Sequence, residues 1–173
     1  LNPPTLFPNN ATLCAGDMIS IIPSSTNPGS TNTFNFYSNG GLTDLLFTGS
    51  VYTFTANTST QIFVTEEING CESISSTYTI NIDPAPGAPA TNSPQEIGVN
   101  EAAPAFTANG TGGTLNWYAT DPAVGNPAPI ASGSPFTPGV ATNNPNTINY
   151  WVTETNGAGC EGPATQVILN IVN

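Results

Sequence analysis

The sequence contains no lysine, arginine or histidine, although eleven of its 173 residues are acidic. About a quarter of the residues in a typical globular protein are charged, and both signs are usually present. The missing residue types exclude side-chain salt bridges, lysine Schiff bases, lysine isopeptide crosslinks, and sites built on guanidinium or imidazole groups. A formal charge of −11 also repels nucleic acids and anionic lipid headgroups, so we expect neither as a partner.

Other absences bear on activity and location. No apolar run approaches the ~20 residues that a membrane-spanning helix needs, so we expect no membrane insertion. No side chain titrates near neutral pH and no nucleophile has a neighbouring base, so we predict that the protein is not an enzyme and needs no cofactor. A chain without lysine or arginine gives trypsin no cleavage site, which fits a secreted, extracellular protein.

An internal repeat organises the chain. The stretch Val64–Glu72 returns almost intact as Val152–Glu161, each time between an apolar run and an alternating segment, as in a β-hairpin. We therefore predict two modules, residues 1–83 and 84–173. Three prolines at alternate positions in the linker, residues 83–89, favour an extended, semi-rigid connection between them.

Turn residues interrupt the chain too often for helices of ordinary length, since glycine and proline contribute 17 residues each. We predict an all-β fold with seven short strands in the first module, a spacing typical of a β-sandwich. The expected strands are 6–7, 18–22, 33–37, 45–47, 51–54, 60–66 and 74–82, with a turn at 23–30. In the second module we expect strands at 105–107, 114–118, 130–137, 149–152 and 166–171. The expected core includes Phe36, Tyr78, Ile80, Ile82, Trp117, Val167, Leu169 and Ile171.

Several short motifs resemble the Ig-like repeats of large surface and secreted proteins in gliding and related Bacteroidetes. The motifs are Cys14-Ala15-Gly16-Asp17, Phe36-Tyr37, Gly40-Gly41, Asn69-Gly70-Cys71-Glu72, Trp117-Tyr118 and, as in a sister repeat, Ala103–Ala108. This resemblance implies two tandem Ig-like antiparallel β-sandwiches joined by the Pro-rich linker. It also implies type IX secretion and a place at the bacterial cell surface.

By the same resemblance Cys14 and Cys71 form a disulfide, which implies an oxidising compartment. Gly98 stands where the second module would have its first cysteine, so Cys160 is expected to be unpaired. Cys160 could be a reactive thiol, an intermolecular disulfide site or the relic of a lost bridge. With no basic side chain to favour its thiolate, we expect a buried, inert relic.

Glutamates gather near the repeated hairpin. Glu66, Glu67 and Glu72 could supply oxygen ligands to Ca²⁺, but no Asp-x-Asp loop accompanies them, and we expect a solvated acidic turn instead. A paired-carboxylate hydrolase is not expected, because Glu66 and Glu67 are neighbours on a strand and should point to opposite faces.

Two aromatic residues fall out of phase with the inward positions around them. Phe63 and Trp151 are therefore expected on an outer face, where a sugar ring or a protein partner could stack. The alternative is that a neighbouring strand or module covers them.

These observations favour a non-enzymatic structural module of an adhesin stalk or surface filament, with neighbouring repeats or identical subunits as partners. One alternative is a subunit that polymerises by strand exchange, in which the segment bearing Leu1, Leu6 and Phe7 completes a sheet of the next copy. The other is a carbohydrate-binding module that uses an aromatic face to bind surface glycans.

Overall fold

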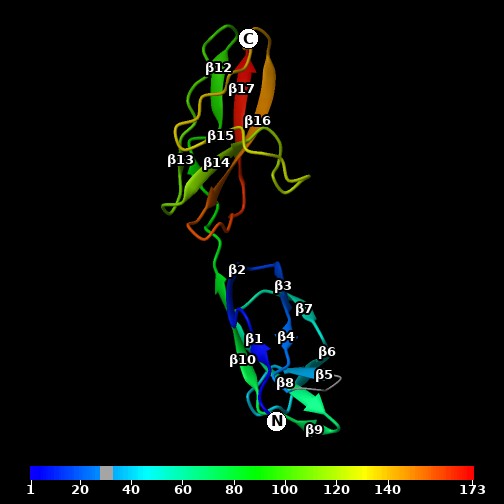
Figure 1. Cartoon of the computed structure of the whole chain (residues 1–173). Helices are drawn as coiled ribbons and strands as arrows, with labels where there is room; N and C mark the ends of the chain where they lie inside the picture. The colour runs from blue at the N-terminus through cyan, green and yellow to red at the C-terminus, as the bar shows by residue number, and fades with distance from the viewer. Residues whose placement is uncertain (28–32) are drawn as a thin grey trace. The chain divides into compact units, whose positions relative to one another are not determined.

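The computed structural model describes residues 1–27 and 33–173, and in these ranges it contains strands and turns but no helix. The chain divides into two compact units, Leu1–Pro84 and Ala85–Asn173, each described by itself below (Figure 1). The first part of the turn expected at residues 23–30 contains the short strand β4 (Pro23–Ser24), and its last part lies outside the described residues.

The main sheet of unit 1 has the strand order β2-β10-β8-β5-β6, with β9 paired to the end of β8 (Figure 1). These strands are β2 (Asn10–Cys14), β5 (Thr33–Tyr37), β6 (Leu45–Gly49), β8 (Thr60–Ile68), β9 (Cys71–Glu72) and β10 (Ser76–Asp83). Only β2 runs parallel to its neighbour, β10, and the other pairs within this sheet are antiparallel.

Short strand pairs lie across the core of unit 1 from this sheet. They are β1 (Thr5–Leu6) with β4, and β3 (Asp17–Ile21) with β7 (Tyr52–Ala56). Between the layers lies a core formed by Leu6, Ile19, Ile21, Phe34, Phe36, Ala56, Ile62, Val64, Tyr78 and Ile80. The alternation predicted for β8 and β10 is confirmed, because Ile62, Val64, Tyr78 and Ile80 are buried while the residues between Ile62 and Val64 and between Tyr78 and Ile80 are not.

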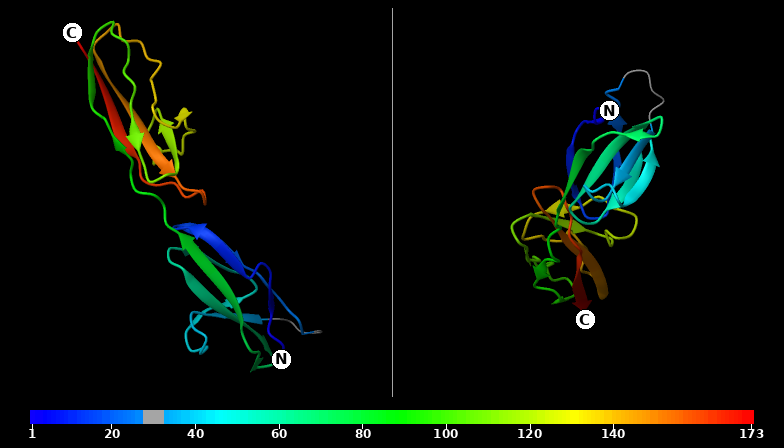
Figure 2. Two further views of the ribbon diagram at one scale, coloured as in Figure 1. Left: turned by 90° about the vertical axis from the view of Figure 1, so that its left-hand side faces the viewer. Right: turned by 90° about the horizontal axis from the view of Figure 1, so that it is seen from below.

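Unit 2 repeats the main sheet in the order β12-β17-β16-β14-β15, and the left view of Figure 2 shows β17 (red) between β12 (green) and β16 (orange). Its strands are β12 (Gln95–Gly98), β14 (Thr114–Tyr118), β15 (Ala131–Ser132), β16 (Asn146–Thr155) and β17 (Thr165–Val172), with β11 (Ala90–Thr91) paired to β13 (Ala108–Asn109). Its core surrounds the fully buried Trp117 and includes Phe106, Tyr150, Val152, Val167, Leu169 and Ile171.

The second layer of unit 2 is thinner than predicted. The strand expected at 105–107 is reduced to one isolated bridge between Phe106 and Phe136, and the strand expected at 130–137 is reduced to β15 and that bridge. Pro104 lies two residues before Phe106 and Pro138 two residues after Phe136, where the next hydrogen-bonded pair of an antiparallel ladder would form. Neither proline has an N–H to donate, so the ladder cannot extend on that side.

The parallel strand pairs of the two units have matching registers. Gly98 lies opposite Val172 at the end of its parallel pair, as Cys14 lies opposite Asp83. In both units the next turn is held in the same way. The N–H of Cys14 donates to Asp17 Oδ2 at 2.9 Å, and the N–H of Gly98 donates to Glu101 Oε2 at 2.8 Å.

Candidate functional site

In unit 1 the repeated hairpin motif contains two turns, one between β8 and β9 and one between β9 and β10. Asn69 and Gly70 have φ values of 53° and 78°, the left-handed conformation that a tight hairpin turn needs. The chain therefore folds β9 back onto β8 before β10 begins, with Glu72 opposite Glu67. This return brings the Glu72 carboxylate onto the outer face of the main sheet, beside side chains of β5 and β8.

Glu72 accepts three hydrogen bonds at that place. The donors are Tyr37 Oη at 2.7 Å, Thr65 Oγ1 at 2.5 Å and Asn35 Nδ2 at 3.1 Å. Burial acts to raise the pKa of Glu72, but these hydrogen bonds outweigh it and the pKa is lowered. Burial and the hydrogen bond to Glu72 raise the pKa of Tyr37 to about 12. An ionised carboxylate and a neutral phenol are therefore paired at neutral pH.

Unit 2 contains the same arrangement. Glu161 Oε1 accepts from Tyr118 Oη at 2.6 Å and from Thr153 Oγ1 at 2.5 Å. Burial, followed by the hydrogen bond to Glu161, raises the pKa of Tyr118. A tyrosine, a threonine and a glutamate thus meet in the same way in both units. This shared contact explains why the repeated motif ends in Cys-Glu each time.

The third residue of the repeated motif is a glutamate, and it is buried in both units. Glu66 accepts from Ser25 Oγ at 2.5 Å and Asn27 Nδ2 at 2.6 Å, and its exposed fraction is 0%. Glu154, also 0% exposed, accepts from the backbone N–H groups of Thr111 at 2.8 Å and Gly113 at 2.5 Å. These backbone hydrogen bonds lower the pKa of Glu154. The expectation of a solvated acidic turn is therefore wrong for Glu66, and Glu154 is buried in the same way. Each of these carboxylates binds the loop that covers it.

The three carboxylates considered as Ca²⁺ ligands are divided between the two faces of the sheet. Glu66 lies on the core face, whereas Glu67 and Glu72 lie on the outer face and share the amide of Asn35, at 3.1 Å from each. In residues 1–27 and 33–173, no group of three His, Cys, Asp or Glu side chains could hold a metal ion.

The predicted pairing of Cys14 with Cys71 and the expectation that Cys160 is unpaired are wrong, whereas Cys160 is buried as expected. Cys71 is a free, exposed thiol, whereas Cys14 and Cys160 are disulfide-bonded and Cys160 is buried. Cys14 lies level with Asp83, beyond the Thr60 end of β8, while Cys71 lies opposite Ile68 at the other end. A nine-residue strand spans roughly 30 Å, and a disulfide needs Cα atoms within about 7 Å. A Cys14–Cys71 bridge is therefore geometrically excluded.

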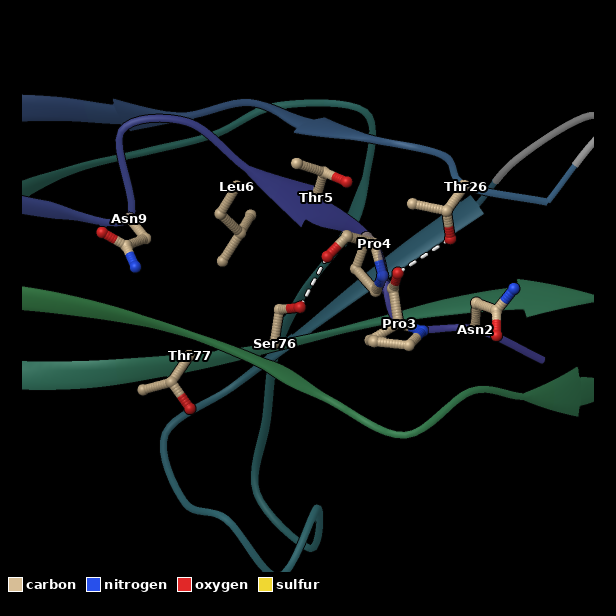
Figure 3. A pocket seen from close by; sticks show the side chains of 9 residues that line it. All are labelled: Asn2, Pro3, Pro4, Thr5, Leu6, Asn9, Thr26, Ser76 and Thr77. Carbon is tan, nitrogen blue, oxygen red and sulfur yellow. Dashed lines mark hydrogen bonds between the residues drawn. The ribbon is translucent and has the colours of Figure 1, made fainter.

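A groove of about 560 Å³ lies beside the N-terminal segment of unit 1 (Figure 3). Its lining residues are Asn2, Pro3, Pro4, Thr5, Leu6, Asn9, Thr26, Ser76 and Thr77. Two hydroxyls hold the segment in place: Ser76 Oγ donates to the Pro4 carbonyl at 2.5 Å, and Thr26 Oγ1 donates to the Pro3 carbonyl at 2.9 Å. Of the residues considered for strand exchange, Leu6 is buried in the core of its own unit, whereas Leu1 and Phe7 are exposed.

A second hollow of about 390 Å³ lies on the outer face of β8 and β10 around Phe63. Its lining residues are Ser38, Ser59, Thr60, Gln61, Phe63, Thr79, Ile80 and Asn81. Phe63 and the corresponding Trp151 are both half-buried, and each stands between two buried residues of its strand. Nothing in the sequence marks this hollow except the phase of Phe63.

Comparison with known proteins gives a family match for unit 1. Residues 2–84 match the family model described as "Ig-like domain CHU_C associated". No curated protein sequence matches the chain. In residues 1–27 and 33–173 there is no helix with the length and apolar character needed to cross a membrane.

Several solved structures resemble the chain at low identity. The fibronectin(III)-like modules of Clostridium thermocellum CbhA are 14% identical with a TM-score of 0.44, over 97% of this chain and 93% of that chain. The insect immune protein hemolin is 14% identical with a TM-score of 0.42, over 98% of this chain and 46% of that one. Dscam is 12% identical with a TM-score of 0.36, over 94% and 43%. The chain thus spans less than half the length of the hemolin and Dscam structures. The family match supports an Ig-like or fibronectin-type repeat over residues 2–84.

Proposed function

We propose that the chain is a non-enzymatic, extracellular structural segment made of two successive Ig-like β-sandwich modules from a bacterial cell-surface adhesin stalk. The observation that carries the proposal is the repetition of one hydrogen-bond framework in both units. Glu66 and Glu154 fix loops, while Glu72 and Glu161 tie the hairpin to the middle of the sheet. In this reading the repeated motif maintains the fold of each module.

Composition and covalent structure support an extracellular place. Disulfides persist mainly in oxidising compartments, and Cys14 and Cys160 are disulfide-bonded. The lack of lysine and arginine removes every trypsin cleavage site from the chain. Carboxylates that are held by hydroxyl, amide and backbone N–H donors give each module polar tie points without basic side chains.

A self-polymerising subunit is the second candidate, and one feature of unit 1 favours it. Strand β6 ends the main sheet and carries the exposed apolar residues Leu45, Leu46 and Phe47. An uncharged, apolar edge strand is a place where another strand can pair. Exchange of the N-terminal segment would first have to release Leu6 from the core of its own unit.

Two measurements separate these candidates. For a stalk segment, light scattering on the purified chain should give the monomer mass of 17.7 kDa, and negative-stain electron microscopy should show no fibres. Regular fibres would overturn the stalk proposal in favour of a filament subunit. Antibodies against the chain should also label intact cells of the source organism, and labelling only after lysis would contradict the extracellular placement.

A further inference from the structure

We propose that the hollow around Phe63 is a binding site for a neutral saccharide. It lies on the outer face of unit 1, on the same face as the side chains that hold Glu72. This proposal goes beyond the structural role above, because a stalk segment needs no ligand, and it adds surface glycans as a partner class for one module.

The sheet register assembles the hollow from neighbouring strands. On β8 the outward residues Gln61 and Phe63 lie opposite Thr79 and Thr77 of β10, and Tyr37 of β5 lies opposite Phe63 on its other side. The ring is therefore bordered along both strands by uncharged side chains. Gly40 lies against the edge of the Phe63 ring, since a Cβ built on it would be only 3.2 Å from Phe63 Cε1. The glycine at this position lets the loop approach the edge of the ring.

The polar groups of the hollow are available to a ligand. Within the described part of the chain, the side chains of Gln61, Thr79 and Asn81 make no hydrogen bond to the protein. Ser59 Oγ accepts the N–H of Ile82 at 2.9 Å, which leaves its own proton to donate. The network around Glu72 on the same face differs, because its side chains are already paired with one another. The hollow thus combines a ring with uncommitted amide and hydroxyl groups.

Charge selects the class of ligand. None of the residues that line the hollow is charged, and the formal charge of −11 disfavours an anion anywhere on the chain. The lining has no carboxylate to hold a cation. A neutral sugar fits this chemistry, because its C–H face can stack on an aromatic ring while its hydroxyls exchange hydrogen bonds with amides and hydroxyls. A volume of about 390 Å³ falls in the range usual for small-ligand sites.

Unit 2 provides an internal contrast. Trp151 occupies the position of Phe63, but the apolar Ile168 replaces Thr79. The counterpart of Asn81 is Asn170, whose Oδ1 accepts from Thr147 Oγ1 at 3.0 Å. Two of the polar groups that unit 1 offers are therefore absent or engaged in unit 2, and we place the site in unit 1.

The test is an NMR titration of the ¹⁵N-labelled full chain with four neutral hexasaccharides: cellohexaose, xylohexaose, mannohexaose and laminarihexaose. We expect at least one of them to shift the side-chain amide signals of Gln61 and Asn81. Phe63→Leu keeps an apolar side chain but removes the stacking face, and should weaken binding about tenfold. Gln61→Ala, at an exposed position, should weaken it several-fold. Asn149→Ala, at the matching position of unit 2, should leave affinity unchanged.

The outcomes are decisive in both directions. If none of the four saccharides shifts the signals of the hollow, the site does not bind neutral glycans and the proposal fails. It also fails if Gln61→Ala and Phe63→Leu both bind with wild-type affinity. The spectrum of each variant reports whether it is folded, so a loss of binding through unfolding is recognised at once. None of these results depends on whether the chain forms fibres or lies on the cell surface.

Discussion

Replacing Thr153 with valine should destabilise unit 2, although the two side chains have nearly the same shape. Thr153 is 1% exposed and its hydroxyl donates to the Glu161 carboxylate at 2.5 Å. Valine cannot donate, so Glu161 would keep only the bond from Tyr118 within this group of three. The substitution removes one framework hydrogen bond and leaves the sheet intact.

The expected magnitude follows from two opposing effects. A hydrogen bond to a charged group contributes about 1.5–3 kcal/mol to stability. The new methyl group is buried and returns up to about 0.8 kcal/mol. The net loss should be about 1–2 kcal/mol in the free energy of unfolding. For a unit of this size, such a loss lowers the unfolding temperature by roughly 4–15 °C.

The assay can be confined to unit 2. The chain has two tryptophans, Trp117 and Trp151, and both lie in that unit. Tryptophan fluorescence during urea unfolding of the full chain therefore reports unit 2. Thr147→Val is the matched control, because Thr147 lies on the same strand but is exposed, and should change stability by less than about 0.5 kcal/mol.

A double-mutant cycle with Glu161→Gln separates the hydrogen bond from other effects of the substitution. Once the carboxylate is neutral, Thr153→Val should cost clearly less than it does in the wild-type background. If Thr153→Val and Thr147→Val have equal effects, or if the cycle shows no coupling, the argument that these carboxylates hold the fold is refuted.

Three further predictions test the electrostatics and the thiols. Because the folded-state pKa of Glu154 is lowered from 4.5, its stabilising contribution is present above that pH and is lost as the pH falls through the folded-state value. Urea unfolding at pH 7 and pH 3 should therefore show a smaller loss of stability for Glu154→Gln than for the wild type. Added NaCl should raise the unfolding temperature, because salt screens repulsion among eleven carboxylates and there are no side-chain ion pairs to weaken; a lowered temperature would contradict this. Iodoacetamide should modify Cys71 alone before reduction and all three cysteines after reduction in denaturant, as mass spectrometry can show; modification of Cys160 before reduction would contradict the structure.

Local patterns in the sequence predict the centre of each sheet well. The strand expected at 33–37 has the bounds of β5, and the buried positions of β10 and β17 follow the predicted alternation, as do Ile62 and Val64 of β8. Strands β10 and β17 are buried on one face, so each carries its own period-two pattern. Strand β2 has no such pattern and was missed, because its place depends on parallel pairing with β10 at the far end of the unit.

The features that could not be predicted from the sequence depend on residues that are far apart in the chain. The disulfide implied by resemblance fails because the expected partners lie at opposite ends of β8. The burial of Glu66 and Glu154 was missed because their hydrogen-bond donors lie 39 to 43 residues away in the chain. One feature of the sequence does indicate that these two glutamates are buried. The dipeptide Thr-Glu occurs in both modules directly after a buried valine, although the loops around it differ in length.

The protein buries glutamates although it has no basic side chain to pair with them. A buried carboxylate usually needs a cationic partner, because removing an unpaired charge from water is costly. Here the partners are neutral donors that the fold already positions, such as the Thr111 and Gly113 N–H groups at Glu154 or the Ser25 hydroxyl at Glu66. A neutral donor adds no second charge whose desolvation would cost free energy. A donor on the folded backbone also loses little conformational entropy when it binds the carboxylate. A chain with no cations can therefore keep carboxylates inside a β-sandwich, provided that its loops present backbone N–H and hydroxyl groups to them.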